Sequence, residues 1–255
     1  MSFIKTPQEI EIIKEGGKRL AVVLHAVAEA AKAGVTPREL DALAEKLIRA
    51  GGDEPAFLNY QPDMAKIPFP ATLCVSVNDA VVHGIPTDIP LKNGDIVGLD
   101  LGIKHGGLFT DSAVTVAIGK ISAEAKELMK VTREALEIGI AAAKPGAYTS
   151  DIGWAIERHI APHRYGIVRE LAGHGVGHEI HEDPYIPNYR DEVKGEKLKP
   201  GMVIAIEPMV NIGSDAIKLA KDKFTYVTKD GSLSAHFEHT LVITEEGNEV
   251  LTRWG

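Results

Sequence analysis

The sequence predicts an α+β fold made of two related halves, each of which combines helices with an antiparallel sheet. The first observation is the alternation of period along the chain, which runs from helical to strand-like spacing and then repeats that order. The second is an internal repeat, because the string around Gly34 resembles the string around Gly146, and the string around Gly94 resembles the string around Gly201.

The first half opens with two helices whose starts carry the same signal. Thr6 and Thr36 each stand before a proline and three residues before a glutamate, which is the pattern of a capping box. Gly51 and Gly52 end the second helix. We expect helices over about 7–32 and 37–50, a loop over 53–70, short strands over 71–77 and 80–85, and a hairpin over 95–104 and 108–118.

The second half repeats the order of helices followed by strands. Ser122 is a good N-cap for a helix that reaches about Ala143. Thr149 or Ser150 starts the next helix, which we expect to extend to about residue 163. From residue 167 onward the pattern predicts strands, with a loop over 182–199.

Composition is typical of an ordinary globular protein. The chain has 255 residues and a mass of 27.4 kDa, with 44% apolar and 25% charged residues, so it can bury a core. Its 36 acidic and 28 basic residues give a net charge of −8, which argues against nucleic acid or an anionic membrane as a partner. We expect one domain over residues 1–255, with halves of about 1–120 and 121–255.

Cysteine usage and hydropathy bear on the compartment. Cys74 is the only cysteine, so no internal disulfide can form and a reducing compartment is expected. No charged-then-apolar leader follows Met1, and no apolar run approaches the roughly 18 residues that span a bilayer. We therefore expect a cytoplasmic protein that does not contact membranes.

The predicted hairpin carries two carboxylates. A two-residue turn at 105–106, or a four-residue turn at 104–107, places Asp100 directly opposite Asp111, whereas a three-residue turn shifts the register. Their neighbours on the same face are Gly98, Gly102 and Ala113. Facing carboxylates repel each other unless a cation lies between them. The small neighbouring residues leave space for such a cationic ligand.

Two more carboxylates interrupt apolar strands in the second half. Glu207 ends the run Met202–Ile206, and Glu238 precedes the run 240–243. A salt bridge or a solvent-facing strand edge explains any single carboxylate of this kind well. Four at repeat-related positions are better explained by a shared site, because a carboxylate is rarely buried without a partner.

A histidine-rich segment adds a nitrogen ligand. The glycines on either side of His174 make a helical zinc motif unfavourable and indicate tightly packed backbone with histidines directed at a site. Four carboxylates and one histidine suit two hard or borderline divalent ions, such as Mn, Fe(II), Co or Zn, which activate water for hydrolysis. A thiol dyad of Cys74 and His83 is conceivable, but a lone cysteine in an apolar strand is more typical of core.

Several ordered strings together resemble the type I methionine aminopeptidases, which have the pita-bread fold, and the resemblance covers nearly the whole chain. The strings are Val82-His83-Gly84-Ile85-Pro86, Gly173-His174-Gly175-Val176-Gly177-His178, His181-Glu182-Asp183-Pro184, Ile206-Glu207-Pro208-Met209-Val210 and Glu238-His239-Thr240. The resemblance implies removal of an N-terminal methionine that precedes a small second residue, by attack of water activated by two metals.

The resemblance also implies roles for individual residues. Asp100 would bind one metal, His174 and Glu207 the other, and Asp111 and Glu238 would bridge both. Glu207 would act as general base. His181 would hydrogen-bond the scissile amide, and His83 would assist at the nitrogen of the leaving residue. Candidates for the methionine pocket are Tyr60, Phe69, Cys74, Ile180 and Phe224, beside a loop over 61–68 that looks longer than usual.

The implied partners are the N-termini of nascent polypeptides, which suggests proximity to the ribosome, and a monomer meets every requirement. An Xaa-Pro aminopeptidase or dipeptidase of the same fold is the main enzymatic alternative, and the segment from Asp100 to Ser112 has some of its character. A binding protein that has lost its metals is the non-enzymatic alternative. That alternative predicts substituted ligands, whereas all five are intact.

Overall fold

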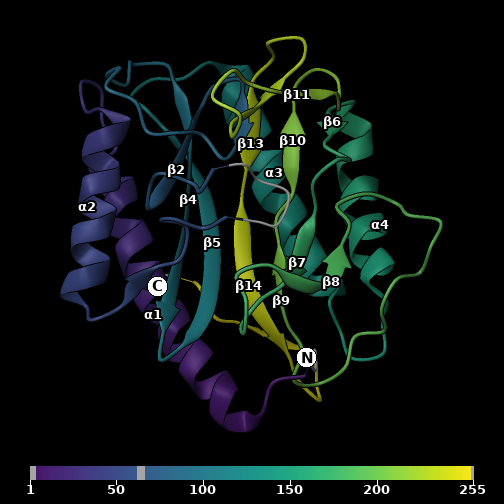
Figure 1. Ribbon diagram of the computed structural model, residues 1–255. Helices are drawn as coiled ribbons and strands as arrows, with labels where there is room; N and C mark the ends of the chain where they lie inside the picture. Colours follow the sequence, from purple (N-terminus) through teal and green to yellow (C-terminus); the bar gives the residue numbers. More distant parts are fainter. Residues whose placement is uncertain (1–3, 62–66, 254–255) are drawn as a thin grey trace.

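The protein is described by a computed structural model of residues 4–61 and 67–253 (Figure 1). The long loop expected over 61–68 falls largely outside these residues. Among the described residues, no helix combines the length and the apolar character needed to cross a membrane.

The helices begin where the capping signals predict. Thr6 and Thr36 accept hydrogen bonds from the backbone N–H groups of Glu9 and Glu39, and each glutamate caps its threonine in return. The first helix ends two residues earlier than expected. The four α-helices are α1 (Pro7–Ala30), α2 (Pro37–Ala50), α3 (Ala123–Ala142) and α4 (Thr149–Ile160), and a 3-10 turn, η1 (Ala161–His163), follows α4.

A nine-stranded sheet forms the centre of the molecule, with the order β1-β4-β5-β14-β9-β7-β8, while β2 pairs with β4 and β15 with β14. Every pairing in it is antiparallel. Its strands are β1 (Glu54–Pro55), β2 (Leu73–Val77), β4 (Ile96–His105), β5 (Leu108–Ala117), β7 (Gly173–Gly175), β8 (Glu182–Ile186), β9 (Val203–Ile206), β14 (Glu238–Ile243) and β15 (Asn248–Val250).

Two three-stranded sheets stand beside the central one, with the orders β13-β10-β6 and β11-β12-β3. The second of them joins segments from both halves, because β3 of the first half pairs with β12 of the second. Their strands are β3 (Ala80–Val82), β6 (Gly166–Ile167), β10 (Met209–Asn211), β11 (Ile217–Leu219), β12 (Tyr226–Thr228) and β13 (Ser234–His236).

Each half of the central sheet is covered by its own pair of helices (Figure 1). Leu20, Leu24 and Leu40 of α1 and α2 share a buried cluster with Leu99 and Leu101 of β4. Leu128, Ile156 and other residues of α3 and α4 form a second cluster with Ile204, Ile206 and Leu241 of β9 and β14. The alternation of helices and strands and the α+β class are therefore confirmed, with the two halves joined by the pairing of β5 with β14.

The structure corrects the predicted register of the hairpin. His105 pairs with Leu108, so the two turn residues are Gly106 and Gly107, not residues 105–106. Both glycines have positive φ, 55° and 88°, which matches the twist of a two-residue hairpin turn. Asp100 therefore pairs with Ala113, and Asp111 with Gly102. The two residues share one face but are diagonal neighbours. Their Cβ atoms are therefore farther apart than they would be if the residues stood directly opposite each other, as predicted.

Three boundaries also differ from the sequence-based expectations. The loop expected over 182–199 begins with β8, because its residues pair with β7 beside the site. The strands expected over 71–77 and 80–85 are shorter, since β2 starts at Leu73 and β3 ends at Val82. His83 directly after β3 has φ 56°, a left-handed conformation that does not continue a strand.

Candidate metal centre

Five neighbouring strands of the central sheet each supply one side chain that could bind a metal, and these five are the candidate ligands. In the order β4, β5, β14, β9 and β7, these side chains are Asp100, Asp111, Glu238, Glu207 (directly after β9) and His174. The pairing of β5 with β14 brings the carboxylates of the two halves together. Glu238 pairs with Ala113, which follows Asp111 by two residues on β5 and so lies on the same face. The sheet thus places five side chains that are distant in sequence in one row across neighbouring strands.

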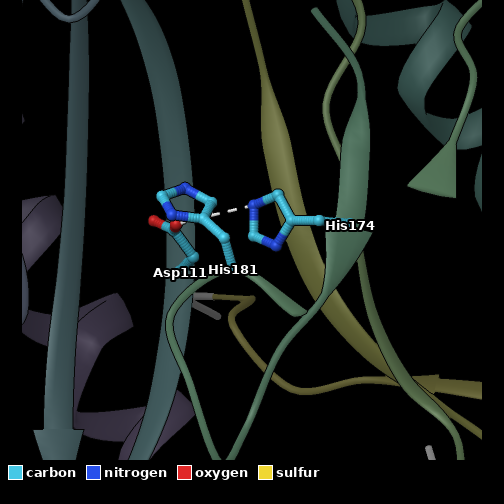
Figure 2. Close-up of side chains that lie close together, drawn as sticks. All are labelled: Asp111, His174 and His181. Carbon is cyan, nitrogen blue, oxygen red and sulfur yellow. Dashed lines mark ion pairs between the residues drawn. The ribbon is translucent and has the colours of Figure 1, made fainter. Parts of the chain in front are cut away.

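Side-chain atoms that could bind a metal lie close together in three overlapping groups. Those of Asp100, Asp111 and Glu238 lie within 4.8 Å of one another, as do those of His174, Glu207 and Glu238, and those of Asp111, His174 and His181. The Nε2 atom of His174 lies 3.4 Å from Oε1 of Glu207. It also lies 4.0 Å from Oδ2 of Asp111, and Figure 2 shows these two side chains beside His181. The structure therefore brings together all five residues that the sequence singled out as ligands.

Glycines allow the His174 strand to lie close to its neighbours. A Cβ atom at Gly173 would collide with the carbonyl oxygen of Ala205, and one at Gly175 with the carbonyl oxygen of Asp183. The Nδ1–H of His174 can donate to the carbonyl oxygen of Gly175 at 2.9 Å, which leaves the Nε2 lone pair directed toward the carboxylates. The Gly-His-Gly string thus fixes both the position and the ligand-forming tautomer of the imidazole.

The carboxylates are buried without enough hydrogen-bond donors. Asp100, Asp111 and Glu238 are only 8%, 3% and 2% exposed, and one oxygen of each has no hydrogen-bond partner among the described residues. Burial raises the pKa of Asp100 and of Glu207 to about 7. Burial, then repulsion from neighbouring carboxylates, raises the pKa values of Asp111 and Glu238 well above their usual range.

Divalent cations fit this donor set. Unpartnered buried carboxylates are costly, and a cation removes both the repulsion and the lack of donors. Oxygen atoms with one imidazole nitrogen are the ligands of hard or borderline ions. The salt-bridge alternative fails here, because no Lys or Arg ion pair involves any of the four carboxylates within residues 4–61 and 67–253.

Two further histidines border the same site. His181 stands at its exposed side, where its ring centroid is 4.5 Å from that of His174 and its Nδ1 is 3.0 Å from the hydroxyl of Tyr60. Desolvation by the surrounding protein atoms, and then the nearby His174 and His83, hold the pKa of His181 well below its usual range. Burial, then the nearby His236 and His174, lowers the pKa of His83 to about 4. Both rings are therefore neutral at pH 7 and can donate or accept a hydrogen bond.

A cavity of about 650 Å³ opens beside the ligands. Four of the five residues predicted for the methionine pocket line it. All five candidate ligands line it as well, together with His83 and His181. Phe69 and Phe224 pack edge to face, with ring centroids 5.5 Å apart. The four predicted lining residues are Tyr60, Phe69, Cys74 and Phe224.

The fifth predicted pocket residue, Ile180, is not among the residues that line this cavity. It is 2% exposed and belongs to the buried cluster that also holds Phe57, Phe69 and Cys74, and its Cδ1 atom lies 3.1 Å from where a Cβ at Gly102 would stand. Residues of the lining that the sequence did not single out include Phe57, Val82, Met209 and Tyr226. Most of them come from short strands whose pairing joins distant parts of the chain.

The sequence-based prediction also omitted His236, which is 3% exposed and has its Nε2 atom 3.5 Å from Oε2 of Glu207. A signal was available, because His236 precedes Glu238 by two residues. In extended chain, residues two apart face the same side.

Comparisons with known proteins agree with this site. The model of metallopeptidase family M24 matches residues 11–245. Methionine aminopeptidase 1 of Bacillus subtilis is 46% identical over 253 residues, covering 99% of this chain and all of the relative. Methionine aminopeptidase of Aquifex aeolicus is 43% identical and covers 96% of each chain.

Solved structures extend the likeness to three dimensions. Methionine aminopeptidase from Thermotoga maritima superimposes with a TM-score of 0.94 at 42% identity, covering 98% of this chain and 99% of the other. A prolidase from Pyrococcus horikoshii gives 0.80 at 27% identity, covering 99% of this chain but 64% of its own. These neighbours confirm the pita-bread fold. By its sequence match, its relatives and its row of ligands, the chain belongs to metallopeptidase family M24.

Proposed function

We propose that this protein removes the N-terminal methionine from polypeptides whose second residue is small. The observation that supports this most strongly is the row of five ligands beside a cavity with an apolar lining. The names of the relatives, methionine aminopeptidases at 41–46% identity over nearly the full length, favour the same activity.

In this proposal two divalent ions, Co, Mn, Fe(II) or Zn, bind among the five ligands. Asp100 would hold one ion, His174 and Glu207 would hold the other, and Asp111 and Glu238 would be within reach of both. The unpartnered oxygens of the three most deeply buried carboxylates support this assignment. Divalent ions supply Lewis acidity, which makes water nucleophilic at neutral pH and stabilises negative charge on the carbonyl oxygen.

Proton transfer falls to Glu207 in this scheme. Its carboxylate accepts a proton from the attacking water and returns it to the departing amine. A pKa raised to about 7 by burial suits a group that must both accept and release a proton near neutral pH. His181 donates a hydrogen bond to the scissile amide, and its contact with Tyr60 orients the ring. His83 assists at the nitrogen of the leaving residue.

Two features of the cavity favour a methionine at a chain end. Asp100 offers a carboxylate to the free α-ammonium of the substrate, which an internal peptide bond lacks. Phe69, Phe224, Cys74 and Tyr60 offer an apolar and partly aromatic surface to the thioether. Ile180 supports this pocket by packing in the same buried cluster as Phe69 and Cys74.

We also infer the setting of this activity from its substrate. The partners are the N-termini of nascent polypeptides, so the protein acts in the cytoplasm, near the ribosome and as a monomer. Residues 1–255 serve as one catalytic domain, with halves of about 1–120 and 121–255.

An Xaa-Pro aminopeptidase or dipeptidase is the second candidate, because the prolidase of Pyrococcus horikoshii shares the fold. The chain is 27% identical to that prolidase but 42% identical to the Thermotoga maritima methionine aminopeptidase, which favours the first candidate.

A panel of peptides separates the candidates. Met-Ala-x, Met-Gly-x and x-Pro peptides are incubated with the protein and each metal in turn, and the released residue is quantified. We expect methionine release that a chelator abolishes. Equal or faster cleavage of x-Pro peptides would move the assignment to the second candidate, and no release with any metal would favour a binding protein.

A further inference from the structure

We propose that His236 is a positioning residue for the general base, and that its Nε2–H donates a hydrogen bond to Oε2 of Glu207. The inference rests on the proposed function, because it concerns the residue to which that function assigns proton transfer. His236 belongs to β13 and lies outside the ligand set.

The two oxygens of Glu207 face two different imidazoles. Oε1 lies 3.4 Å from Nε2 of His174, and Oε2 lies 3.5 Å from Nε2 of His236. Because Nδ1 of His174 is placed to donate to the carbonyl oxygen of Gly175, its Nε2 has no proton to offer. His236 is therefore the imidazole that can supply a donor to this carboxylate.

The Nε2 atom of His236 has no competing use. It is buried and has no hydrogen-bond partner in the part of the chain that the structure describes. A buried N–H without an acceptor is unfavourable, and the nearest carboxylate oxygen is at the outer limit of hydrogen-bond distance. A slight rotation of either side chain forms the bond, and the bond satisfies both groups.

The backbone around His236 is held firmly enough to position another group. Its N–H donates to the hydroxyl of Thr115 at 2.9 Å, and that hydroxyl donates to its carbonyl oxygen at 2.7 Å. In addition, β13 pairs with β10 so that His236 stands opposite Met209, two residues beyond Glu207. On the other side, Asn188 donates to the carbonyl oxygen of Glu207 at 3.1 Å.

Fixing the base matters because a carboxylate can rotate. With its main chain held and one oxygen bound by His236, Glu207 keeps the other oxygen directed toward His174 and the ligand row. Loss of the donor leaves the carboxylate in several orientations, of which only some can accept the proton. The expected cost is the 10- to 100-fold, in order of magnitude, that outer partners of metal sites contribute.

Three variants test this inference in the metal-loaded enzyme. His236→Leu keeps volume but removes the donor, and His236→Gln keeps a side-chain N–H. His239→Leu is the matched control, because it removes a nearby histidine whose Nδ1 contacts Thr252 instead of Glu207. We expect kcat for a Met-Ala-x peptide to fall about 10- to 100-fold in His236→Leu, with KM changed less than about threefold. His236→Gln should restore most of the loss, and His239→Leu should leave kcat near the wild-type value.

A second readout does not depend on turnover. In zinc-loaded protein labelled with ¹⁵N-histidine, His236 should carry its proton on Nε2, and that signal should shift in Glu207→Gln. A proton on Nδ1 alone, or wild-type kcat in His236→Leu, would overturn the inference. If the wild-type protein releases no methionine, the proposed function fails, whereas the labelled protein still reports whether His236 binds Glu207.

Discussion

The hairpin β4–β5 and the strands of the second half contribute differently to the same site. The hairpin supplies two carboxylates, Asp100 and Asp111, from strands joined by a two-residue turn. The second half supplies two carboxylates as well, but it surrounds them with the imidazoles of His174, His181 and His236. In the proposed function the hairpin therefore concentrates charge for metal binding, whereas the second half also provides the groups proposed to donate, accept and orient protons.

The largest effect is expected from removing charge on the hairpin. Asp111→Asn takes away the carboxylate proposed to contact both metals, so both ions should bind weakly and turnover should fall by more than the ~100-fold typical of outer partners. Metal content after dialysis, together with kcat/KM, checks this. A variant with full metal content and full turnover would show that the hairpin is not the centre of the site.

Removing an imidazole from the second half should separate binding from catalysis. His181→Ala should retain its metals, since all five candidate ligands are intact, while kcat falls about 100-fold for loss of a hydrogen bond to the reacting amide. The same two measurements apply. Loss of metal with loss of turnover would mean that His181 is a ligand, and that the contrast between the regions is wrong.

The glycines of the two regions should respond differently to a methyl group. A Cβ at Gly175 would collide with the main-chain carbonyl of Asp183, which cannot move without shifting β8. A Cβ at Gly102 would meet side-chain atoms of Ala56, Phe57 and Ile180 at 2.9 to 3.1 Å, which can adjust more readily.

Gly175→Ala should therefore lower the free energy of unfolding by about 1–3 kcal/mol, and Gly102→Ala by less. Urea denaturation of both metal-free variants measures the difference. A larger loss for Gly102→Ala would contradict the expectation that the main chain beside Gly175 adjusts less readily than the side chains beside Gly102.

The pH dependence of stability should be shared by both regions. Burial raises the pKa values of Asp100 and Glu207 to about 7, from 3.8 and 4.5. A group with a raised pKa in the folded state stabilises the protein fully below its unfolded pKa, and that stability is lost as pH rises through the folded pKa. The metal-free protein should thus lose thermal stability between about pH 4 and pH 7.

Metal should reverse that trend, because binding requires ionised carboxylates and strengthens as they lose protons. Thermal unfolding midpoints with and without manganese should diverge as pH rises from 5 to 8. A Glu207→Gln variant lacks one of the titrating groups and should show a smaller fall in its metal-free form. A constant difference between the two curves would mean that the carboxylates are not the ligands.

The sequence was more informative about local structure than about pairing between distant strands. Capping boxes located α1 and α2 because Thr6, Thr36 and their glutamates interact within one turn. The hairpin was predicted with the wrong register, since composition alone did not show that Gly106 and Gly107, rather than His105, occupy the turn.

The site illustrates the same limit. The repeat related Asp100 to Glu207 and Asp111 to Glu238 without any knowledge of the sheet. The row of five strands depends on the pairing of β5 with β14, which joins residues more than a hundred positions apart and leaves no local signal. Ile180 was expected in the pocket, but it packs against Gly102 in the same buried cluster as Phe69 and Cys74 and is not among the residues that line the cavity.

Anomalous scattering from crystals grown with manganese tests the central claim most directly, because it locates the ions without reference to activity. We predict two peaks within coordination distance of Asp100, Asp111, His174, Glu207 and Glu238, with the two bridging carboxylates between them. Peaks elsewhere on the molecule, or a lysine or arginine among these carboxylates in place of the ions, would contradict the account.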